Sequence, residues 1–245
     1  MEYMLYEDKD HKFILIGFGE SQDEKRIPSN QYMITHNDNS VLLDPGGFGI
    51  FPILASRILK HTSVENIKAI ILSHQDPDVS GGLHIWEEVT NAKIYISKLW
   101  TRFIPHYDLR RVDNIISIPD EGLEINIAEN FTVKAIPAHF MHSPGHISVY
   151  DPISKILFTG DIGASVLPCS DNRLFVKDFQ SFKPCIEGFH KRYLASNTAS
   201  RKWIKEIENL DIKIIAPQHG YLYRNETIEE FLKWLYDLKC GVDLM

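Results

Sequence analysis

Short apolar runs recur along the chain and predict strands separated by polar turns. The runs before residue 45 alternate with polar residues in the manner of antiparallel strands. The predicted strands cover residues 2–7, 12–18, 30–35, 40–44, 67–72, 131–137, 155–159 and 212–216. Apolar positions at helical spacing predict helices over residues 51–60, 82–89, 98–106, 179–194, 197–210 and 226–239.

The order of these elements predicts an α/β fold. Helices and strands alternate through the middle of the chain, which favours two mixed sheets packed face to face with helices outside. The chain has 245 residues, of which 44% are hydrophobic. That is enough to bury a large core, and no linker-like segment divides the sequence. We therefore expect one domain over residues 1–245.

Four of the predicted strands end in residues that commonly bind metals. Each is followed by histidine or aspartate beside glycine or proline, and the candidate ligands are His74, Asp76, Asp78, His139, His142, His146, Asp161 and His219. One such ending alone is ordinary turn chemistry. Four of them meet only if their strands lie side by side, and this pattern predicts a metal site on loops at one sheet edge.

The charge of these residues favours two metal ions. Asp76, Asp78 and Asp161 would repel one another if brought together, and burial would force protonation unless cations were present. Two divalent cations would outweigh the three carboxylates by one charge, which suits a hydroxide, an oxo group or a reduced oxygen species between the metals. Carboxylate oxygens also shift the preference from zinc towards iron or manganese.

The order of these residues resembles the metal ligands of the metallo-β-lactamase fold. The chain has His-x-Asp-x-Asp at residues 74–78, followed by His142, Asp161 and His219. Most hydrolases of that fold have His-x-His-x-Asp-His, so the chain departs at Asp76 and Val79. An acid at the second position is similar to the diiron module of flavodiiron proteins. The segments SHQDPDVSGGL, PAHFMHSPGH, LFTGDIGAS and FHKRYLASN resemble oxygen-binding diiron proteins, which keep this module without a flavodoxin domain.

This resemblance implies an αββα sandwich with a two-iron site. One iron would take His74, Asp76 and His142, the other would take Asp78 and His219, and Asp161 would bridge them. An oxo or hydroxo group would also bridge the irons, and no FMN is expected in this chain. By the same resemblance, Asp44 in the 44–47 turn supports the ligand loop without binding metal.

The implied function is the binding or reduction of dioxygen, or the binding of nitric oxide. Such a protein would be an oxygen sensor with a signalling partner, or a reductase that needs an external electron donor. The alternative is a dinuclear metal hydrolase, in which a metal-bound hydroxide attacks an ester, a thioester or a phosphodiester. Flavodiiron relatives form dimers, so the resemblance also implies a homodimer.

The remaining histidines and one tyrosine receive different predictions. Asp161 lies 19 positions after His142, which is close to the flavodiiron spacing and favours His142 over its neighbours as the ligand. His139 and His146 are expected to orient ligands by hydrogen bonds, with replacement of His142 as the ligand as the alternative. His84 and Tyr221 are expected to face or border the site, with packing as the alternative. The histidines expected at the surface are His11, His36, His61 and His106.

Val79 stands where many relatives have a histidine ligand. An isopropyl group cannot bind a metal, so we expect one metal to have fewer protein ligands and to be more labile than the other. The alternative is that Val79 only packs, with His84 turning in to fill the position. His190 and the segment around it are expected to have a structural role.

Composition excludes several classes of protein. The net charge of −7 and the pI near 5.9 argue against nucleic-acid binding. The chain has no signal-like start and no apolar run long enough to span a bilayer, so we expect a cytoplasmic protein with no membrane contact. The three cysteines, Cys169, Cys185 and Cys240, are expected to be reduced thiols and not metal ligands.

Overall fold

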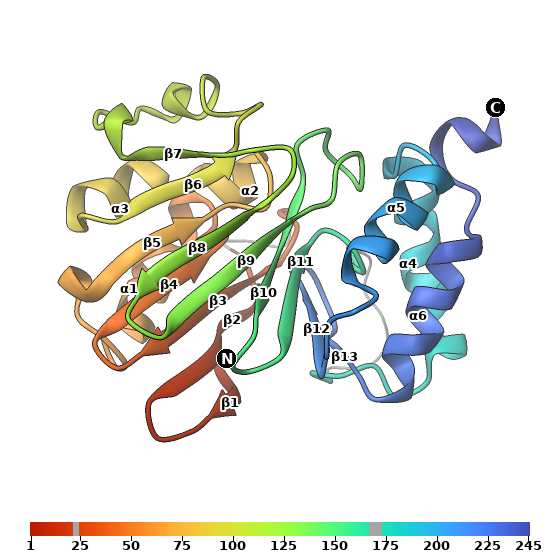
Figure 1. The fold of residues 1–245 in the computed structure, drawn as a ribbon, viewed down its shortest axis with the longest axis horizontal. Helices are drawn as coiled ribbons and strands as arrows, with labels where there is room; N and C mark the ends of the chain where they lie inside the picture. Colours follow the sequence, from red (N-terminus) through yellow and green to blue (C-terminus); the bar gives the residue numbers. More distant parts are fainter. Residues whose placement is uncertain (22–24, 167–172) are drawn as a thin grey trace.

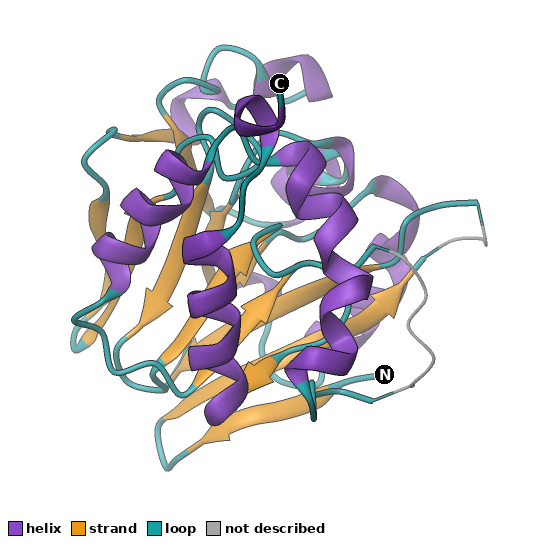
Figure 2. Ribbon diagram, turned by 90° about the vertical axis from the view of Figure 1, so that its right-hand side faces the viewer, coloured by secondary structure: helices purple, strands orange, loops and turns teal. Residues whose placement is uncertain are grey.

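Two sheets pack face to face in the computed structural model, which describes residues 1–21, 25–166 and 173–245. The first sheet has the order β1-β2-β3-β4-β5-β6-β7 and the second has the order β13-β12-β11-β10-β9-β8 (Figure 1). Helices cover the outer face of each sheet (Figures 1 and 2). The predicted αββα sandwich is therefore confirmed.

The first sheet combines antiparallel and parallel strands. Its strands are β1 (Tyr3–Glu7), β2 (His11–Glu20), β3 (Ser29–His36), β4 (Asn39–Leu43), β5 (Ile67–Ile71), β6 (Lys93–Ser97) and β7 (Ile115–Ile118). Strands β1 to β4 pair antiparallel, and β4 to β7 pair parallel. The outer helices are α1 (Phe51–Ile58) and α3 (Leu83–Val89), with a one-turn helix α2 (Pro77–Ser80) at the sheet edge.

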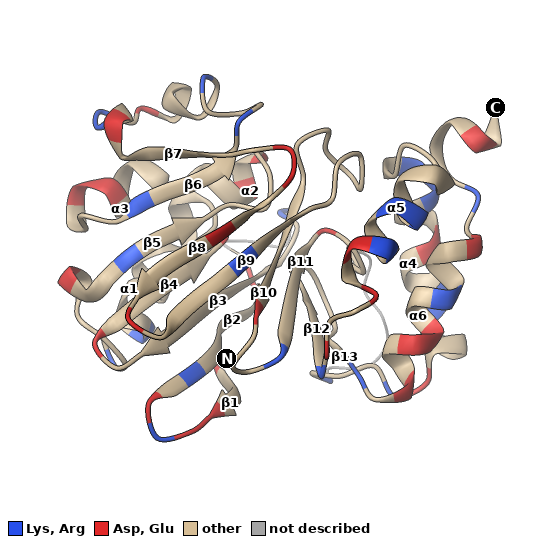
Figure 3. Cartoon of the chain, viewed as in Figure 1, with Lys and Arg blue, Asp and Glu red and all other residues tan. Residues whose placement is uncertain are grey.

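The second sheet is antiparallel except for the pair β11 and β12. Its strands are β8 (Leu123–Ala128), β9 (Phe131–Pro137), β10 (Ile147–Asp151), β11 (Ile156–Gly160), β12 (Ile214–Pro217) and β13 (Tyr223–Arg224). Its outer helices are α4 (Phe179–Tyr193), α5 (Asn197–Ile207) and α6 (Glu226–Asp237). Acidic and basic residues are interspersed on the outer helices (Figure 3).

Three apolar clusters hold the layers together. The cluster between the sheets includes Phe13, Ile71, Val149 and Phe158. A second cluster joins α1 and α3 to the first sheet, and a third joins α4, α5 and α6 to the second sheet. The strands next to both layers are accordingly apolar on both faces, which is why their sequences read as continuous apolar runs.

The predicted helix over residues 98–106 is wrong. The structure has turns there, followed by a short 3-10 helix, Ile104–Tyr107. Pro105 lacks a backbone N–H and would remove a hydrogen bond from the interior of such a helix, which disfavours it. Strands β6, β7, β8 and β10 were missed, because their apolar runs are short.

His11 was expected at the surface, and the structure buries it. Its side chain is 1% exposed, and its Nε2 lies 2.7 Å from Oδ2 of Asp151, which is fully buried. His11 begins β2 and faces the second sheet, where its ring also contacts Phe131. Its Nδ1 lies 3.2 Å from Nδ1 of His36. The prediction was wrong because the polar residues before His11 suggested a surface turn, whereas His11 lies on the inward face of β2.

The cysteine prediction is also corrected. Cys185 is part of a disulfide, so the expectation of reduced thiols is wrong for this residue. Cys240 is a free, buried thiol, and Cys169 lies outside the described residues. In the ranges that the structure describes, no helix is long and apolar enough to cross a membrane.

The inter-sheet cluster yields a stability prediction. Phe158 is fully buried and its ring lies 5.3 Å from that of Tyr32. Replacing it by alanine removes these contacts and leaves a cavity, so Phe158→Ala should lower the free energy of unfolding by about 3–5 kcal/mol. Phe48→Ala is the control, since Phe48 is 63% exposed and should change stability by about 0.5 kcal/mol or less. Equal losses in urea unfolding of the two variants would contradict this account of the core.

Candidate metal centre

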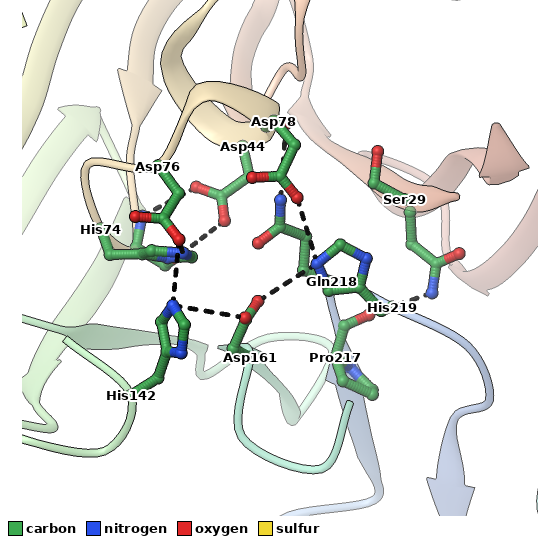
Figure 4. A network of polar contacts seen from close by, with 12 residues as sticks. Ser29, Asp44, His74, Asp76, Asp78, His142, Asp161, Pro217, Gln218 and His219 are labelled. Atoms are coloured by element: carbon green, nitrogen blue, oxygen red, sulfur yellow. Dashed lines mark hydrogen bonds and ion pairs between the residues drawn. The ribbon is translucent and has the colours of Figure 1, made fainter. Parts of the chain in front are cut away.

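Loops at one edge of the sandwich bring six predicted ligands together (Figure 4). They follow strands of both sheets: β5 leads into the 73–78 segment, β9 into the loop with His142, β11 into Asp161, and β12 into His219. The backbone ties these loops to one another. Ile147 donates its N–H to the carbonyl of Ser73 at 2.9 Å, and Gln218 donates its N–H to the carbonyl of Gly160 at 2.7 Å.

The segment after β5 is a one-turn helix and not only a loop. Asp76 is the N-cap residue, with an extended backbone, and Pro77 occupies the first turn. Proline suits this position because it needs no hydrogen bond from its nitrogen there. Asp76 therefore lies before the turn and Asp78 within it, and the two carboxylates point to different histidines.

The first group of ligands surrounds Oδ2 of Asp76. This oxygen lies 3.1 Å from Nε2 of His142 and 3.5 Å from Nε2 of His74. Nε2 of His142 also lies 3.7 Å from Oδ2 of Asp161. One ligand atom from each of His74, His142 and Asp161 lies within 4.8 Å of the other two, which is the spacing around a single ion.

The second group is smaller and shares Asp161 with the first. Nε2 of His219 lies 3.3 Å from Oδ2 of Asp78 and 3.4 Å from Oδ1 of Asp161. Asp161 thus presents one oxygen to each group. It is only 4% exposed, and its Oδ1 accepts no hydrogen bond among the described residues. A buried carboxylate oxygen without a donor is costly unless a cation lies beside it, so this donor set fits two metal ions.

Hydrogen bonds orient two of the three histidines. His74 donates its Nδ1–H to Oγ of Ser73 at 2.8 Å, and the Ser73 hydroxyl donates to Asp44. Asp44 also accepts the backbone N–H of Ser73 at 2.7 Å. His219 donates its Nδ1–H to the carbonyl of Pro28 at 2.8 Å. Both rings therefore turn Nε2 towards the centre, where it can bind a metal once its proton has left.

Asp44 has the supporting position that the resemblance implied. The contributions of Ser73 and Pro28 were missed. Ser73 lies directly before His74 and after a buried strand, which was a usable signal. Pro28 lies 191 residues from its partner His219, and no local pattern reveals such a contact.

The electrostatics of the cluster favour added positive charge. Burial opposes ionisation of Asp161, but His219, His74 and His142 hold its pKa well below the usual range. Burial would lower the pKa of His74, but Asp161, Asp76 and Asp44 raise it to about 9. Burial raises the pKa of Asp44 to about 7, despite the opposing effect of His74. In the metal-free protein, protonated histidines thus supply the positive charge that the carboxylates need.

The four other predicted site residues lie in different surroundings. His146 is buried, its ring stacks on that of His74 at 5.2 Å, and its Nε2 accepts the backbone N–H of Asp161 at 3.3 Å. His139 bonds instead to the carbonyls of Pro144 and Asp120. The ring of His84 stacks on that of Phe48, and the ring of Tyr221 contacts that of Phe182. Of these contacts, those of His146 reach the metal ligands directly.

Val79 packs in the core. Val79 is completely buried and belongs to the apolar cluster between the first sheet and its helices. His84, which was considered as a replacement ligand, stacks on Phe48 at a ring distance of 5.8 Å. Neither Val79 nor His84 therefore adds a side chain to the second group of candidate ligands.

A cavity of about 430 Å³ opens onto five of the six candidate ligands, all except His74. Its lining includes Asp76, Asp78, His142, Asp161 and His219, together with Glu20, Arg26, Ile27, Ile50, Val166, Phe189 and Tyr193. The two aromatic residues come from α4, whose segment was assigned only a structural role. Their contact with His142 depends on tertiary packing, so spacing along the sequence did not reveal it.

The sandwich and its edge site define a metallo-β-lactamase fold with a two-metal centre of the diiron-module type. The chain belongs to the family described as "ODP family beta lactamase", whose model matches residues 27–220. This range contains all six predicted ligands.

Solved structures agree with this assignment. The apo state of chemotaxis sensor ODP from T. denticola is 46% identical, with a TM-score of 0.90, over 99% of this chain and 96% of that chain. A structure described as the peroxy diiron species of chemotaxis sensor ODP matches equally well and covers 97% of that chain. The flavodiiron protein from Giardia intestinalis shares the fold, with 19% identity and a TM-score of 0.77 over 91% of this chain and 56% of that chain.

Curated relatives are more distant. The uncharacterized protein MJ0732 of Methanocaldococcus jannaschii is 29% identical over 84% of this chain. The match covers 52% of that protein, so the chain spans about half the length of this relative. The probable metallo-hydrolase YybB of Bacillus subtilis is 27% identical over 84% of this chain and 88% of its own length.

The charge balance of the site predicts how the metal-free protein responds to pH. The pKa of His74 rises from 6.5 to about 9 on folding, and that of His219 is also raised. A raised pKa gives stability that is full below the unfolded value and is lost as pH rises through the folded value. The pKa of Asp44 is also raised, from 3.8 to about 7. Its contribution to stability is therefore also lost as pH rises, but at a lower pH than that of the histidines.

The metal-free protein should therefore be less stable at pH 9 than at pH 6. Urea unfolding at the two pH values measures the difference, and the same titration on His74→Gln should show a smaller one. A free energy of unfolding that is constant or increases over this range would show that the histidines do not balance the carboxylates.

Proposed function

We propose that this chain is a non-haem diiron protein that binds dioxygen. The observation that carries the proposal is the position of Asp161, whose two oxygens face two separate groups of histidine and aspartate ligands. The family of the chain and its similarity to a chemotaxis sensor described with a peroxy diiron species support iron as the metal and dioxygen as the ligand.

The ligand assignment follows the two groups. His74, Asp76 and His142 would hold one iron, Asp78 and His219 would hold the other, and Asp161 would bridge them. A pair of ferrous ions would supply two electrons to dioxygen. Two ferrous ions carry four positive charges, and the three carboxylates carry three negative ones. An oxo or hydroxo bridge would balance the positive charge that remains.

The protein's own residues control access and charge. Asp44, through Ser73, holds His74 with its Nε2 towards the metal, and Pro28 does the same for His219. Ile27, Ile50 and Val166 give the cavity apolar walls, which suit a small uncharged diatomic molecule. The same walls would accept nitric oxide as a second ligand.

A sensor is favoured over a reductase. Two solved structures of a chemotaxis sensor match this chain at 46% identity. A sensor needs only to bind dioxygen and to transmit the resulting change to a signalling protein. Repeated reduction would need an external electron donor, because no FMN is expected in this chain. A cytoplasmic homodimer, expected from the resemblance, stays a prediction.

Hydrolysis is the second candidate function. The similarity to a probable metallo-hydrolase favours it, and the six ligands could hold two metals that activate water. Asp76 in place of a second histidine argues against it, because a carboxylate-rich set prefers iron to zinc.

Iron loading separates the two functions. Protein loaded with ferrous iron without oxygen should contain about two irons per chain, and air should then produce an absorption band of the oxidised iron pair in the near-ultraviolet or visible range. A zinc-loaded sample is the control and should stay colourless. An iron-replete spectrum that is unchanged by oxygen, with zinc-dependent cleavage of esters or phosphodiesters, would support the hydrolase.

The bridging position of Asp161 gives a second prediction. Asp161→Ala should cost binding of both metals, whereas Asp76→Ala should leave the metal of Asp78 and His219 in place. Metal counts after gel filtration measure this, and Asp120→Ala, a half-exposed surface change, is the control. Equal losses in the Asp161 and Asp76 variants would remove the proposed asymmetry.

A further inference from the structure

His142 is held differently from the other two histidine ligands. His74 and His219 each donate Nδ1–H to a fixed acceptor at 2.8 Å. Nδ1 of His142 is buried and has no hydrogen-bond partner in the part of the chain that the structure describes. Its backbone has a φ of 100°, in a region that side-chain-bearing residues rarely adopt. The one side-chain hydrogen bond of His142 runs from Nε2, the atom that would bind the metal, to Oδ2 of Asp76 at 3.1 Å. No hydrogen bond at Nδ1 and no relaxed backbone therefore set the orientation of the ring.

Two aromatic rings of α4 cover His142 instead. The ring of His142 stacks on that of Tyr193, with centroids 5.3 Å apart and planes 30° apart. It also stacks on the ring of Phe189, at 5.8 Å and 25°. Phe189 and Tyr193 lie one helical turn apart and stack on each other at 4.7 Å and 27°. These are offset stacks of the favourable kind, and they restrict rotation of the imidazole by packing against its face.

The backbone joins the His142 loop to the end of the same helix. Met141 forms a β-bridge with Leu194, and Ala195 donates its N–H to the carbonyl of Phe140 at 3.1 Å. The ring stack and these backbone contacts lie next to each other, so the last turn of α4 and the His142 loop are held as one unit.

We propose that Phe189 and Tyr193 are positioning residues that hold His142 in its metal-binding orientation. Their ring stacking takes the place of the Nδ1 hydrogen bond that orients His74 and His219. The rings carry this role, and the hydroxyl of Tyr193 does not. The proposal rests on the proposed function only in taking His142 as a ligand. It also explains why a half-exposed tyrosine, 53% accessible, lies at the mouth of the metal cavity.

The test compares variants of the full-length chain. Tyr193→Leu, Phe189→Leu and the double variant remove rings, and Tyr193→Phe keeps the ring without the hydroxyl. Tyr236→Leu is the control, because Tyr236 is similarly exposed at 45% and packs on Arg201 of α5. Each protein is loaded with two equivalents of ferrous iron without oxygen, and iron release to a chelator is followed over time.

Removal of one ring should speed the release of one of the two irons about tenfold, as for other groups that orient a metal-binding histidine. The double variant should exceed either single variant. Tyr193→Phe and Tyr236→Leu should match the wild type. In metal-free protein, the NMR signals of the His142 ring should lose the ring-current shift of the stack in the leucine variants only, a change that general destabilisation does not produce.

Three results would overturn the proposal: unchanged release in the double variant, a Tyr193→Phe variant that behaves like Tyr193→Leu, or unchanged His142 signals in the double variant. If the double variant fails to fold, iron release and the His142 signals of the Tyr193→Leu variant decide the test, because Tyr193 is partly exposed. A wild-type chain that binds no iron would refute the proposed function instead, and the NMR shift in metal-free protein would still decide whether the rings hold His142.

Discussion

The buried carboxylate of Asp161 is the constraint around which the two halves of the molecule are arranged. It is almost inaccessible, and one of its oxygens lacks a hydrogen-bond donor among the described residues. The charges that balance it come from both sheets, with His74 after β5 of the first sheet and His219 after β12 of the second. Neither sheet alone could build the site, so the packing of the sandwich and the chemistry of its edge depend on each other.

The two groups of candidate ligands differ at the two positions, 76 and 79, where the chain departs from the His-x-His-x-Asp-His pattern of most hydrolases of this fold. An acid at residue 76 adds a carboxylate to the group of His74 and His142. Val79 joins the apolar core and adds nothing to the group of His219. If both groups bind metal as proposed, Asp76 adds a ligand to the first group and Val79 adds none to the second, so the two metals would have unequal numbers of protein ligands. Unequal sites suit a protein in which one metal is fixed and the other meets an external ligand.

Much of the fold and most of the centre could be predicted from the sequence, because both have local signals. β9 was predicted with its observed bounds, since its apolar residues alternate. The six candidate ligands were predicted because they lie in the segments that follow strands β5, β9, β11 and β12. Residues 98–106 were predicted wrongly because helical spacing outweighed Pro105, although proline is a strong local signal.

Other features could not be predicted because they depend on contacts between distant segments. The burial of His11 comes from a partner 140 residues away. The stacking of Tyr193 on His142 requires α4 to pack beside a loop that precedes it by about 50 residues. Polar or aromatic residues at such positions look the same in the sequence whether they face solvent or a neighbour.

The buried pair of His11 and Asp151 has a consequence for the far end of the molecule. Strand β10 begins at Ile147, which bonds to Ser73 beside the metal ligands, and it ends at Asp151, which bonds to His11 of the first sheet. The strand is thus fastened to the opposite sheet at both ends and cannot slide along it. The distance between the segments of the two sheets that carry the candidate ligands is therefore held by the polypeptide itself, through a backbone hydrogen bond at one end of β10 and a buried side-chain pair at the other.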